Sequence, residues 1–509
     1  MKFSCVGERS GCCWRARGCG LEPYTSDAPD GPTPLPPLPA WHLTDVEQLL
    51  PTHPPIEASG ELNPSDPDAI DRMLAEGFGD VAAAPGEPHL ALTLDQTEPP
   101  SPGSNRHLLS RFVHLADAQL TDDESPARFA SLDLPGITAF RPQEGHGCRI
   151  LNAAVRTINA IDAQTPLDFV VLGGDNVDNA QQNEHAWLLA VLGGADRVDC
   201  DSGVDDDPVP GPDNDPKDPF VAEGLHVPWL WVTGNHDVLR QGLTDVALYL
   251  DIPIGSEALH GTRDWSQHGG PVVKGEVAAD PDRAFLDSAT IFEAIATDGD
   301  GHGIDAAALS MGKASYVHDV AGTPLRMIVI DTASPAGGAE GAITQSDLDA
   351  FIRPALDAAR DEGKLAILNS HHSSNTLSNE EEGGPVLPGQ LTEAQWQAFV
   401  ASYDNVLMHL AGHSHIHRVH RRTQGEGTYW EVITSALADY PHQMRVVEVW
   451  DEDNGHISVR LTSLDYATEG DPVASDGRAR GVIDFTSGWW EESKGEAEDR
   501  NVILYVPKP

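Results

Sequence analysis

Polar side chains of the kinds that bind metals follow five apolar, β-prone runs of this 509-residue chain. The central run, residues 229–237, reads Trp-Leu-Trp-Val-Thr-Gly-Asn-His-Asp, so Asn235, His236 and Asp237 follow its apolar part directly. Four other runs end in a similar way, at residues 111–119, 169–176, 365–372 and 406–415. Carboxylate, amide and imidazole groups in such a set suit Mn, Fe, Zn or Co.

These side chains could catalyse a metal-assisted hydrolysis. Two cations about 3.5–4 Å apart can share one aspartate, lower the pKa of a bridging water and hold the oxygens of an in-line phosphoryl displacement. The sequence contains no serine or cysteine nucleophile elbow and no Gly-rich phosphate loop. The sequence therefore disfavours a side-chain nucleophile and P-loop chemistry.

The five runs are expected to be buried strands that bring their polar ends to one edge. In an open α/β sheet the ligand crevice lies beyond the carboxyl ends of the strands. Apolar residues at helical spacing predict helices between the strands, over residues 152–161, over 346–362 with Ser346 as its N-cap, and over 393–402. A further strand is expected over residues 325–330.

Beyond His415 the pattern changes to antiparallel strands with almost no helix. The expected strands cover residues 429–434, 444–450, 456–461 and 502–506. No internal repeat at a fixed period is visible. We therefore expect one large α/β domain over residues 86–509, with two sheets packed face to face.

Residues 1–85 are expected to form a separate N-terminal region. The first twenty residues are basic and contain Cys5, Cys12, Cys13 and Cys19, but they lack the apolar core of a secretory signal. Residues 22–55 are rich in Pro, Asp and Gly and predict a linker. Short helical patterns lie at residues 44–50 and 66–78, and a short strand is expected at 89–94.

The acidic composition limits the partners of this chain. With 80 acidic and 32 basic residues the net charge is -48, which repels phosphate backbones and disfavours nucleic acid as the main partner. We interpret this charge as a solvated acidic surface, as in salt-adapted proteins. No run approaches the roughly 18 apolar residues of a membrane span. The protein is expected to be cytoplasmic or exported, in the latter case with Cys19 as a lipid anchor.

Two stretches are interpreted as insertions. Residues 199–219 are dense in Asp and Pro and predict a solvated surface loop, since their carboxylates lack the regular spacing of a calcium loop. Residues 255–303 are rich in Gly and are a candidate lid. The sequence leaves open whether Cys148 pairs with Cys200.

Taken together, the polar strand ends resemble the motifs of calcineurin-like metallophosphoesterases. The motifs are Asp117-x-Gln119, Gly174-Asp175-Asn176-Val177-Asp178, Gly234-Asn235-His236-Asp237, His371 and Gly412-His413-Ser414-His415. Their order and rough spacing match the family, and the similarity covers about residues 112–461. The resemblance implies two mixed β-sheets packed face to face and flanked by helices, with a binuclear site at the strand ends.

The resemblance also implies roles for single residues. The site would hold two divalent or trivalent ions (Mn, Fe, Zn or Co). The first ion would be bound by Asp117, Gln119 and His415, and the second by Asn235, His371 and His413. Asp175 would bridge the two ions. His236 would face the phosphate, where it stabilises the transition state or protonates the leaving group, while Asp237 fixes its orientation. His372, Asn375 and His417 lie beside motif positions and are either wall residues or substrate contacts.

One residue departs from the family pattern. Gln119 stands where the family usually has histidine, as in some bacterial members, and its neutral amide oxygen puts full occupancy of the first metal site in question. The implied function is hydrolysis of a small phosphomonoester or phosphodiester by a hydroxide held at a binuclear metal centre. The alternative is a non-catalytic metal-binding or interaction protein on the same scaffold, but the intact His236 speaks against it.

Some polar residues near the motifs are expected to have only structural roles. His114 and His409 lie inside apolar runs and are interpreted as interior histidines, and Asp331 as the cap of a turn. A basic patch around His420, Arg421 and Arg422 is the one feature that would suit a nuclease.

Overall fold

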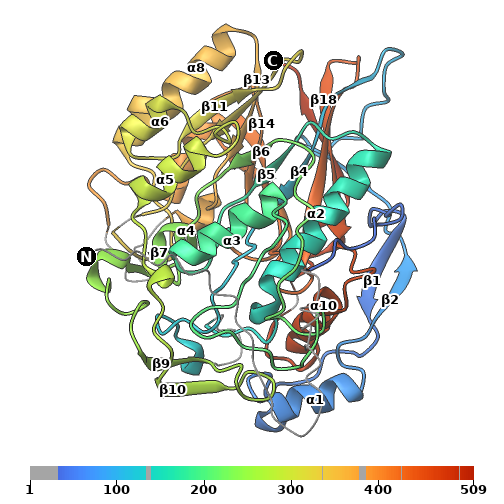
Figure 1. Cartoon of the computed structure of the whole chain (residues 1–509). Helices are drawn as coiled ribbons and strands as arrows, with labels where there is room; N and C mark the ends of the chain where they lie inside the picture. The colour runs from blue at the N-terminus through green and yellow to red at the C-terminus, as the bar shows by residue number, and fades with distance from the viewer. Residues whose placement is uncertain (1–31, 133–138, 335, 378–385, 426, 492) are drawn as a thin grey trace, which may run out of the picture.

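Two mixed β-sheets form the centre of the protein, and helices lie on their outer sides (Figure 1). The computed structural model describes residues 32–132, 139–334, 336–377, 386–425, 427–491 and 493–509. Residues 1–31, which include Cys19 and the expected lipid anchor, lie outside the described residues. None of the described helices is both long and apolar enough to cross a membrane.

The first sheet contains three of the five expected motif strands. Its seven strands follow the order β3 (Leu90–Thr93), β19 (Val502–Pro507), β18 (His456–Asp465), β17 (Gln443–Asp451), β4 (His107–Leu115), β5 (Phe169–Leu172) and β6 (Trp229–Trp231). Strands β4, β5 and β6 are parallel to one another, whereas β17, β18 and β19 pair antiparallel. The polar residues that follow β4, β5 and β6 therefore leave the sheet at one edge.

The second sheet contains the other two motif strands. Its six strands follow the order β11 (Tyr316–Asp319), β12 (Leu325–Val329), β13 (Leu365–Asn369), β14 (Val406–Ala411), β16 (Gly427–Ile433) and β15 (Arg418–Gln424). The four central strands are parallel, and the edge strands β11 and β15 are antiparallel to their neighbours. This confirms the predicted fold class of two mixed sheets.

Alternate side chains of the strands fill separate cores. On β13, Ile367 belongs to the central core shared by the two sheets, and Leu368 to the core beneath α8 (Arg353–Asp361) and α9 (Glu393–Ala401). Helices α2 (Gly147–Gln164) and α3 (Gln182–Gly193) pack on the first sheet, and Figure 1 shows them in front of β4, β5 and β6. The strands that end in polar motifs are therefore covered on both sides.

The remaining elements are short or peripheral. The helices are α1 (Pro67–Ala75), α4 (Asn235–Val238), α5 (Ser288–Thr297), α6 (Ala306–Met311), α7 (Gln345–Asp347) and α10 (Pro472–Thr486). The small strand pairs are β1 (Glu47–Pro51) with β2 (Val81–Pro85), β7 (Leu239–Arg240) with β8 (Thr244–Asp245), and β9 (Glu257–Arg263) with β10 (Val272–Glu276). Residues 255–303 thus form a hairpin and α5.

Three local predictions from the sequence are wrong. Residues 44–50 do not form a helix, because Glu47–Pro51 pairs with β2, and a helix of that length is marginal without tertiary support. The N-cap before α7 is Thr344, whose hydroxyl accepts from the amide of Asp347, and Ser346 already lies inside the helix. The C-terminal part contains α10, a helix of 15 residues. Its apolar pattern is interrupted by two glycines. Gly477 lies against the side chains of His146 and Ile150, and Gly481 lies against the side chain of His442.

The described part of the Pro-rich N-terminal segment packs on the domain and does not behave as a free linker. The Trp41 indole donates to the Asp465 carbonyl at 2.7 Å, and the Thr44 hydroxyl donates to the Ser463 carbonyl at 2.8 Å. The Arg156 guanidinium of α2 donates to the Pro36 carbonyl at 2.6 Å. The proposed division at residue 86 stays a prediction.

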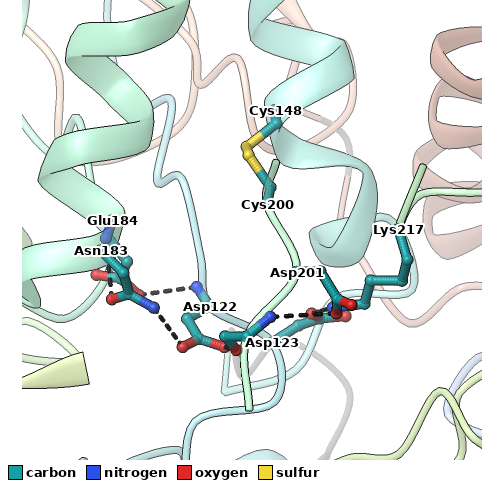
Figure 2. The surroundings of a disulfide bond; sticks show 9 residues. Asp122, Asp123, Cys148, Asn183, Glu184, Cys200, Asp201 and Lys217 are labelled. Atoms are coloured by element: carbon teal, nitrogen blue, oxygen red, sulfur yellow. Dashed lines mark hydrogen bonds and ion pairs between the residues drawn. A yellow bond between two sulfur atoms is a disulfide. The ribbon is translucent and has the colours of Figure 1, made fainter. Parts of the chain in front are cut away.

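The acidic insertion at residues 199–219 is tied to the domain, as Figure 2 shows. A disulfide joins Cys148 of α2 to Cys200. The Lys217 ammonium is buried and lies 2.6 Å from Glu124 and 3.1 Å from Asp123. Carboxylate oxygens of Glu124 and Asp201 also approach one another, and Lys217 supplies their counter-charge. The segment is a loop, as predicted, but it is only partly solvated.

The disulfide should contribute measurably to stability. Cys148 and Cys200 are 52 residues apart, and a loop of that length corresponds to about 4 kcal/mol in the chain-entropy description. We expect Cys148→Ser combined with Cys200→Ser to lower the free energy of unfolding by about 2–4 kcal/mol in urea denaturation. An unchanged unfolding midpoint would show that the Lys217 contacts alone anchor the insertion.

Candidate active site

The carboxyl ends of β4, β5, β6, β13 and β14 meet between the two sheets. The Asp117 amide donates to the Gly174 carbonyl at 3.0 Å, which joins the segments after β4 and β5. The Gly412 amide donates to the His371 carbonyl at 2.9 Å, which joins those after β14 and β13. The His371 ring bridges the sheets, since its Nδ1 donates to the Gly173 carbonyl at 2.9 Å.

Asp175, Asn235, His371 and His413 form the more complete group of candidate ligands. When His371 is neutral and carries its proton on Nδ1, the lone pair of Nε2 points toward Asp175 Oδ2, which lies 3.0 Å away. Two electron-rich atoms at that distance require a cation between them, either a proton or a metal ion. The Asn235 amide donates to the Gly242 carbonyl at 3.1 Å, and its buried Oδ1 has no hydrogen-bond partner among the described residues. These residues fit a metal site.

The other group of candidate ligands is less complete. His415 Nε2 lies 3.3 Å from Asp117 Oδ1, and its Nδ1 lies 2.6 Å from Asp439 Oδ2, which orients the ring. The Gln119 amide oxygen, however, accepts a hydrogen bond from Arg141, whose Nε also donates to Asp439 at 2.7 Å. Gln119 is therefore turned toward a guanidinium, and the expectation that it offers its oxygen to a metal is not supported. Asp117, Asp175 and His415 remain as candidate ligands of this group.

The electrostatics of both groups favour positive charge. Burial opposes the charged form of His371, but the carboxylates of Asp175 and Asp117 outweigh burial and raise its pKa to about 9. Burial likewise opposes the charged form of His415, and Asp117 and Asp439 raise its pKa to about 10. For His413, burial and the neighbouring imidazoles lower the pKa well below its ordinary value, which keeps the neutral, metal-binding form. The carboxylates that attract a proton here would equally attract a metal cation.

Backbone conformation supports a functional assignment for this region. Asp117, Gln119, Asp175, His413 and His415 all have φ between 39° and 70°, a region that side chains other than glycine rarely adopt. Such residues cost of order 1–3 kcal/mol each and cluster at functional sites.

Two glycines of the motifs allow the close approach of the carboxylates. A Cβ on Gly412 would lie 2.6 Å from Asp117 Oδ2, and a Cβ on Gly234 would collide with the Asp175 carboxylate.

His236 is oriented by Asp178 and not by Asp237. His236 Nδ1 lies 3.0 Å from Asp178 Oδ1, and the His236 amide donates to Asp175 Oδ1 at 2.8 Å. Burial lowers the pKa of His236, but Asp175 and Asp178 together hold it above its ordinary value. The prediction for Asp237 is wrong because α4 begins here, and its carboxylate turns back to accept the amides of Gly234 at 2.7 Å and Asp175 at 3.0 Å. Asp237 thus shapes the loop that presents His236.

A cavity of about 540 Å³ opens over these residues. The candidate residues on its lining are Gln119, Asp175, Asn235, His236, His413 and His415. The larger apolar side chains on its lining are Phe129, Leu132, Leu243 and Trp490. No residue of the candidate lid, 255–303, is among the described lining residues.

None of the three candidates for substrate contact is among the described lining residues of this cavity. His372 is fully buried, with Nδ1 2.8 Å from the Thr332 hydroxyl and Nε2 3.0 Å from the Ala339 carbonyl. His417 is buried behind the site, where its Nδ1 accepts from Arg445 at 2.7 Å. Asn375 is exposed on the outer surface. Of the two interpretations, the structure therefore favours wall residues for His372 and His417.

The expected structural residues have the roles that the sequence suggests. His114 and His409 are buried and bonded, His114 to the Thr434 hydroxyl at 2.8 Å and His409 to the Ser370 hydroxyl at 2.7 Å. Asp331 accepts the amides of Ala314 and Ala333, both at 3.1 Å, and so caps a turn.

Sequence reasoning missed Asp178, Arg141 and Asp439. Asp178 belongs to a quoted motif, Gly174-Asp175-Asn176-Val177-Asp178, but its contact with His236 depends on how two loops meet. Arg141 and Asp439 lie in loops without periodicity, and no motif marks them.

The contact between Gln119 and Arg141 predicts two metal affinities that differ. At the first site, that of Asp117 and His415, a neutral amide replaces an imidazole and a guanidinium lies behind it. This site should therefore bind its ion more weakly than the site of Asn235, His371 and His413, and the loss of affinity should be smallest for Mn²⁺. Gln119→His should tighten the first site by about 10-fold, ~1.4 kcal/mol, if His415 and Asp439 keep their geometry. Calorimetric titration of both proteins with Mn²⁺ and Zn²⁺ measures this. Identical affinities in both proteins would show that position 119 does not contribute.

Comparison with known proteins agrees with this site. The family model described as calcineurin-like phosphoesterase matches residues 110–417, which contain every candidate ligand. No curated protein sequence matches the chain.

Three solved structures resemble the chain at low identity. A dimetal phosphatase from Danio rerio is 12% identical with a TM-score of 0.39, over 71% of this chain and 100% of that one. Purple acid phosphatase PPD1 from yellow lupin seeds is 12% identical with a TM-score of 0.30, over 77% and 55%. The sulfate thiohydrolase SoxB of Thermus thermophilus, in complex with glycerol, is 13% identical with a TM-score of 0.29, over 75% and 60%. The assignment rests on the family match, and the chain belongs to the calcineurin-like phosphoesterase family.

Proposed function

We propose that this protein hydrolyses a small phosphomonoester or phosphodiester with water, at a binuclear metal centre between the strand ends of its two sheets. The observation that carries the proposal is the convergence of Asp117, Asp175 and His371, whose side chains each bring a ligand atom within 4.8 Å of the other two. Asp175 and Asn235 line a cavity large enough for a small substrate, and the buried Oδ1 of Asn235 has no hydrogen-bond partner among the described residues.

The chain offers two sets of metal ligands that share one carboxylate. Asp175, Asn235, His371 and His413 would hold one ion, and Asp117, Asp175 and His415 the other. When bound, ions such as Mn, Fe, Zn or Co supply Lewis acidity, which activates water near neutral pH and neutralises the phosphoryl charge. The Gln119 amide and the Arg141 guanidinium border the set that contains Asp117 and His415.

His236 is the proposed proton donor. It lines the cavity, and because Asp178 and the backbone hold Nδ1, Nε2 is the ring nitrogen left for the substrate. Its raised pKa favours the imidazolium, which can donate a hydrogen bond to a phosphoryl oxygen or a proton to the leaving-group oxygen. Asp178 is a positioning residue in this scheme.

Nucleic acid is not proposed as the substrate. The basic stretch on β15 does not line the cavity, and its charges are engaged elsewhere. Arg422 lies 2.6 Å from the buried Glu431, and Arg421 donates to the Leu94 carbonyl at 2.8 Å. With a net charge of -48, long-range attraction of a polyanion is not expected.

The experiment is a substrate panel with purified full-length protein. The protein is treated with a chelator and then supplied with single metal ions, and phosphate or alcohol release is measured from matched mono- and diesters. We expect activity to disappear with the chelator and to return with metal. Metal binding without turnover of any ester would favour the non-catalytic alternative, and failure to bind metal would contradict both.

We also propose that the protein acts in an oxidising compartment. The disulfide between Cys148 and Cys200 supports export, because such bonds are rare in reducing cytosol. Alkylation of thiols in intact cells, followed by mass spectrometry, tests this. Finding Cys148 and Cys200 as free thiols in the native protein would contradict export.

A further inference from the structure

The cavity over the candidate site has two chemically different parts. The metal-ligand candidates and His236 form its polar part, where a phosphoryl group would lie. The larger apolar side chains elsewhere on the lining are Phe129, Leu132, Leu243 and Trp490, with Gln241 among them, and no lysine or arginine occurs among the described lining residues. A substrate bound through its phosphate therefore has apolar side chains available for its remaining part.

The apolar side chains are held by contacts behind them. The Phe129 amide donates to the Gln241 side chain at 2.7 Å, which ties the segment after β4 to the segment that carries Leu243. The Arg240 guanidinium lies 4.2 Å from the centre of the Phe129 ring and donates to the Ala127 carbonyl at 2.7 Å. Arg240 thus supports the apolar wall and is not among the described lining residues of the cavity.

The two leucines of the wall are about half exposed. Leu132 is 54% exposed and Leu243 is 50% exposed, yet both line the cavity that contains the candidate site. An apolar group of a ligand that covered them would gain about 25 cal/mol for each Å² of apolar surface removed from water. The Trp490 ring lies 6.1 Å from the His415 ring, beside the polar part.

A strongly charged or polyhydroxylated leaving group does not match this lining. A nucleoside diphosphate or triphosphate would bring further negative charge into a cavity that has no lysine or arginine among its described lining residues, in a protein of net charge -48. A sugar would place many of its hydroxyl groups against leucine and phenylalanine, because Gln241, Ser414 and the Trp490 indole are the only side chains with hydrogen-bonding groups on the described lining outside the polar part.

From this lining we propose that the substrate is a phosphoester whose leaving group is uncharged and apolar, an alkyl or aryl alcohol, held by Phe129, Leu132, Leu243 and Trp490. This inference rests on the proposed function, since it assumes that the phosphate binds at the metal ligands. It names a specificity that the family match does not.

The first test compares binding without turnover. Hexylphosphonate and methylphosphonate carry the same phosphoryl group but differ in apolar length, and calorimetry on the metal-loaded protein measures both. We expect hexylphosphonate to bind at least about 10-fold more tightly. Equal affinity of the two phosphonates would overturn the apolar-wall proposal, whatever the enzyme hydrolyses.

The second test uses turnover with matched variants. For wild type, kcat/KM should be at least about 10-fold higher for hexyl phosphate than for glycerol 3-phosphate, although hexanol is not the better leaving group. Leu243→Asp should remove most of that preference through KM. Leu248→Asp is the control, because Leu248 is 69% exposed in the same region but does not line the cavity, and it should keep the preference.

The outcomes separate the two proposals. The proposal of an apolar leaving group would be contradicted if both esters were hydrolysed without preference, or if the preference were unchanged in Leu243→Asp. Neither result would contradict the phosphoesterase function. Tighter binding of hexylphosphonate without hydrolysis of any ester would support the proposal that the apolar lining binds the alkyl group, and it would contradict the proposed function.

Discussion

His236→Ala should lower kcat by about 100-fold or more and leave the metal content nearly unchanged. The reason is that His236 lines the cavity and is oriented by Asp178 at 3.0 Å, but it does not belong to either group of candidate ligands. The measurement is steady-state turnover of a phosphomonoester, together with metal analysis of the same preparations. His268→Ala is a suitable control, because His268 is an exposed histidine that lies 2.7 Å from Asp71.

Two results would contradict this role of His236. Near-normal turnover in His236→Ala would show that another group protonates the leaving group. Loss of metal in the variant would show that His236 acts on the metal site, and the kinetic effect could then not be assigned to proton transfer.

Asp175→Asn should abolish both metal binding and activity. The Asp175 carboxylate is the charge that both ligand groups share, and His371 Nε2 lies 3.0 Å from it. Burial would raise the pKa of Asp175, but His371 and His236 hold it well below its usual range, so the group is charged. A ligand at 100-fold its Kd stabilises a protein by about 2.7 kcal/mol, and this metal-dependent gain in thermal stability should vanish in the variant.

Asp331→Asn provides the matched control for the variant at Asp175. Asp331 is also a buried aspartate just beyond a strand, but it caps a turn and lies outside both ligand groups. We expect it to keep the metal-dependent rise in Tm. If Asp175→Asn still binds two ions per chain, Asp175 does not bridge them.

The motif strands could be predicted because apolar runs that end in polar residues mark buried parallel strands. All five motif strands are present, and the polar residues after them lie together between the sheets. Other elements had no such signal. Strand β1 forms only because β2 lies beside it, and the periodicity of α10 is hidden by Gly477 and Gly481, which allow close packing.

The contacts within the site depend on tertiary structure that the sequence does not show. Asp237 follows His236 directly and was expected to orient it, but the short helix α4 turns its carboxylate back onto backbone amides. Asp178 takes that place because the segments after β5 and β6 pack together. Arg141, which binds Gln119, comes from a loop without periodicity, and so do the apolar residues of the cavity wall.

The most direct test of the central claim follows the oxygen of the attacking water. Purified protein supplied with metal is given a phosphomonoester in water labelled with a heavy oxygen isotope, and both products are analysed by mass spectrometry. Hydrolysis at phosphorus predicts that the label enters the released phosphate, that the alcohol stays unlabelled, and that a chelator stops the reaction. Label in the alcohol, or no phosphate release with any of Mn, Fe, Zn or Co, would contradict the account.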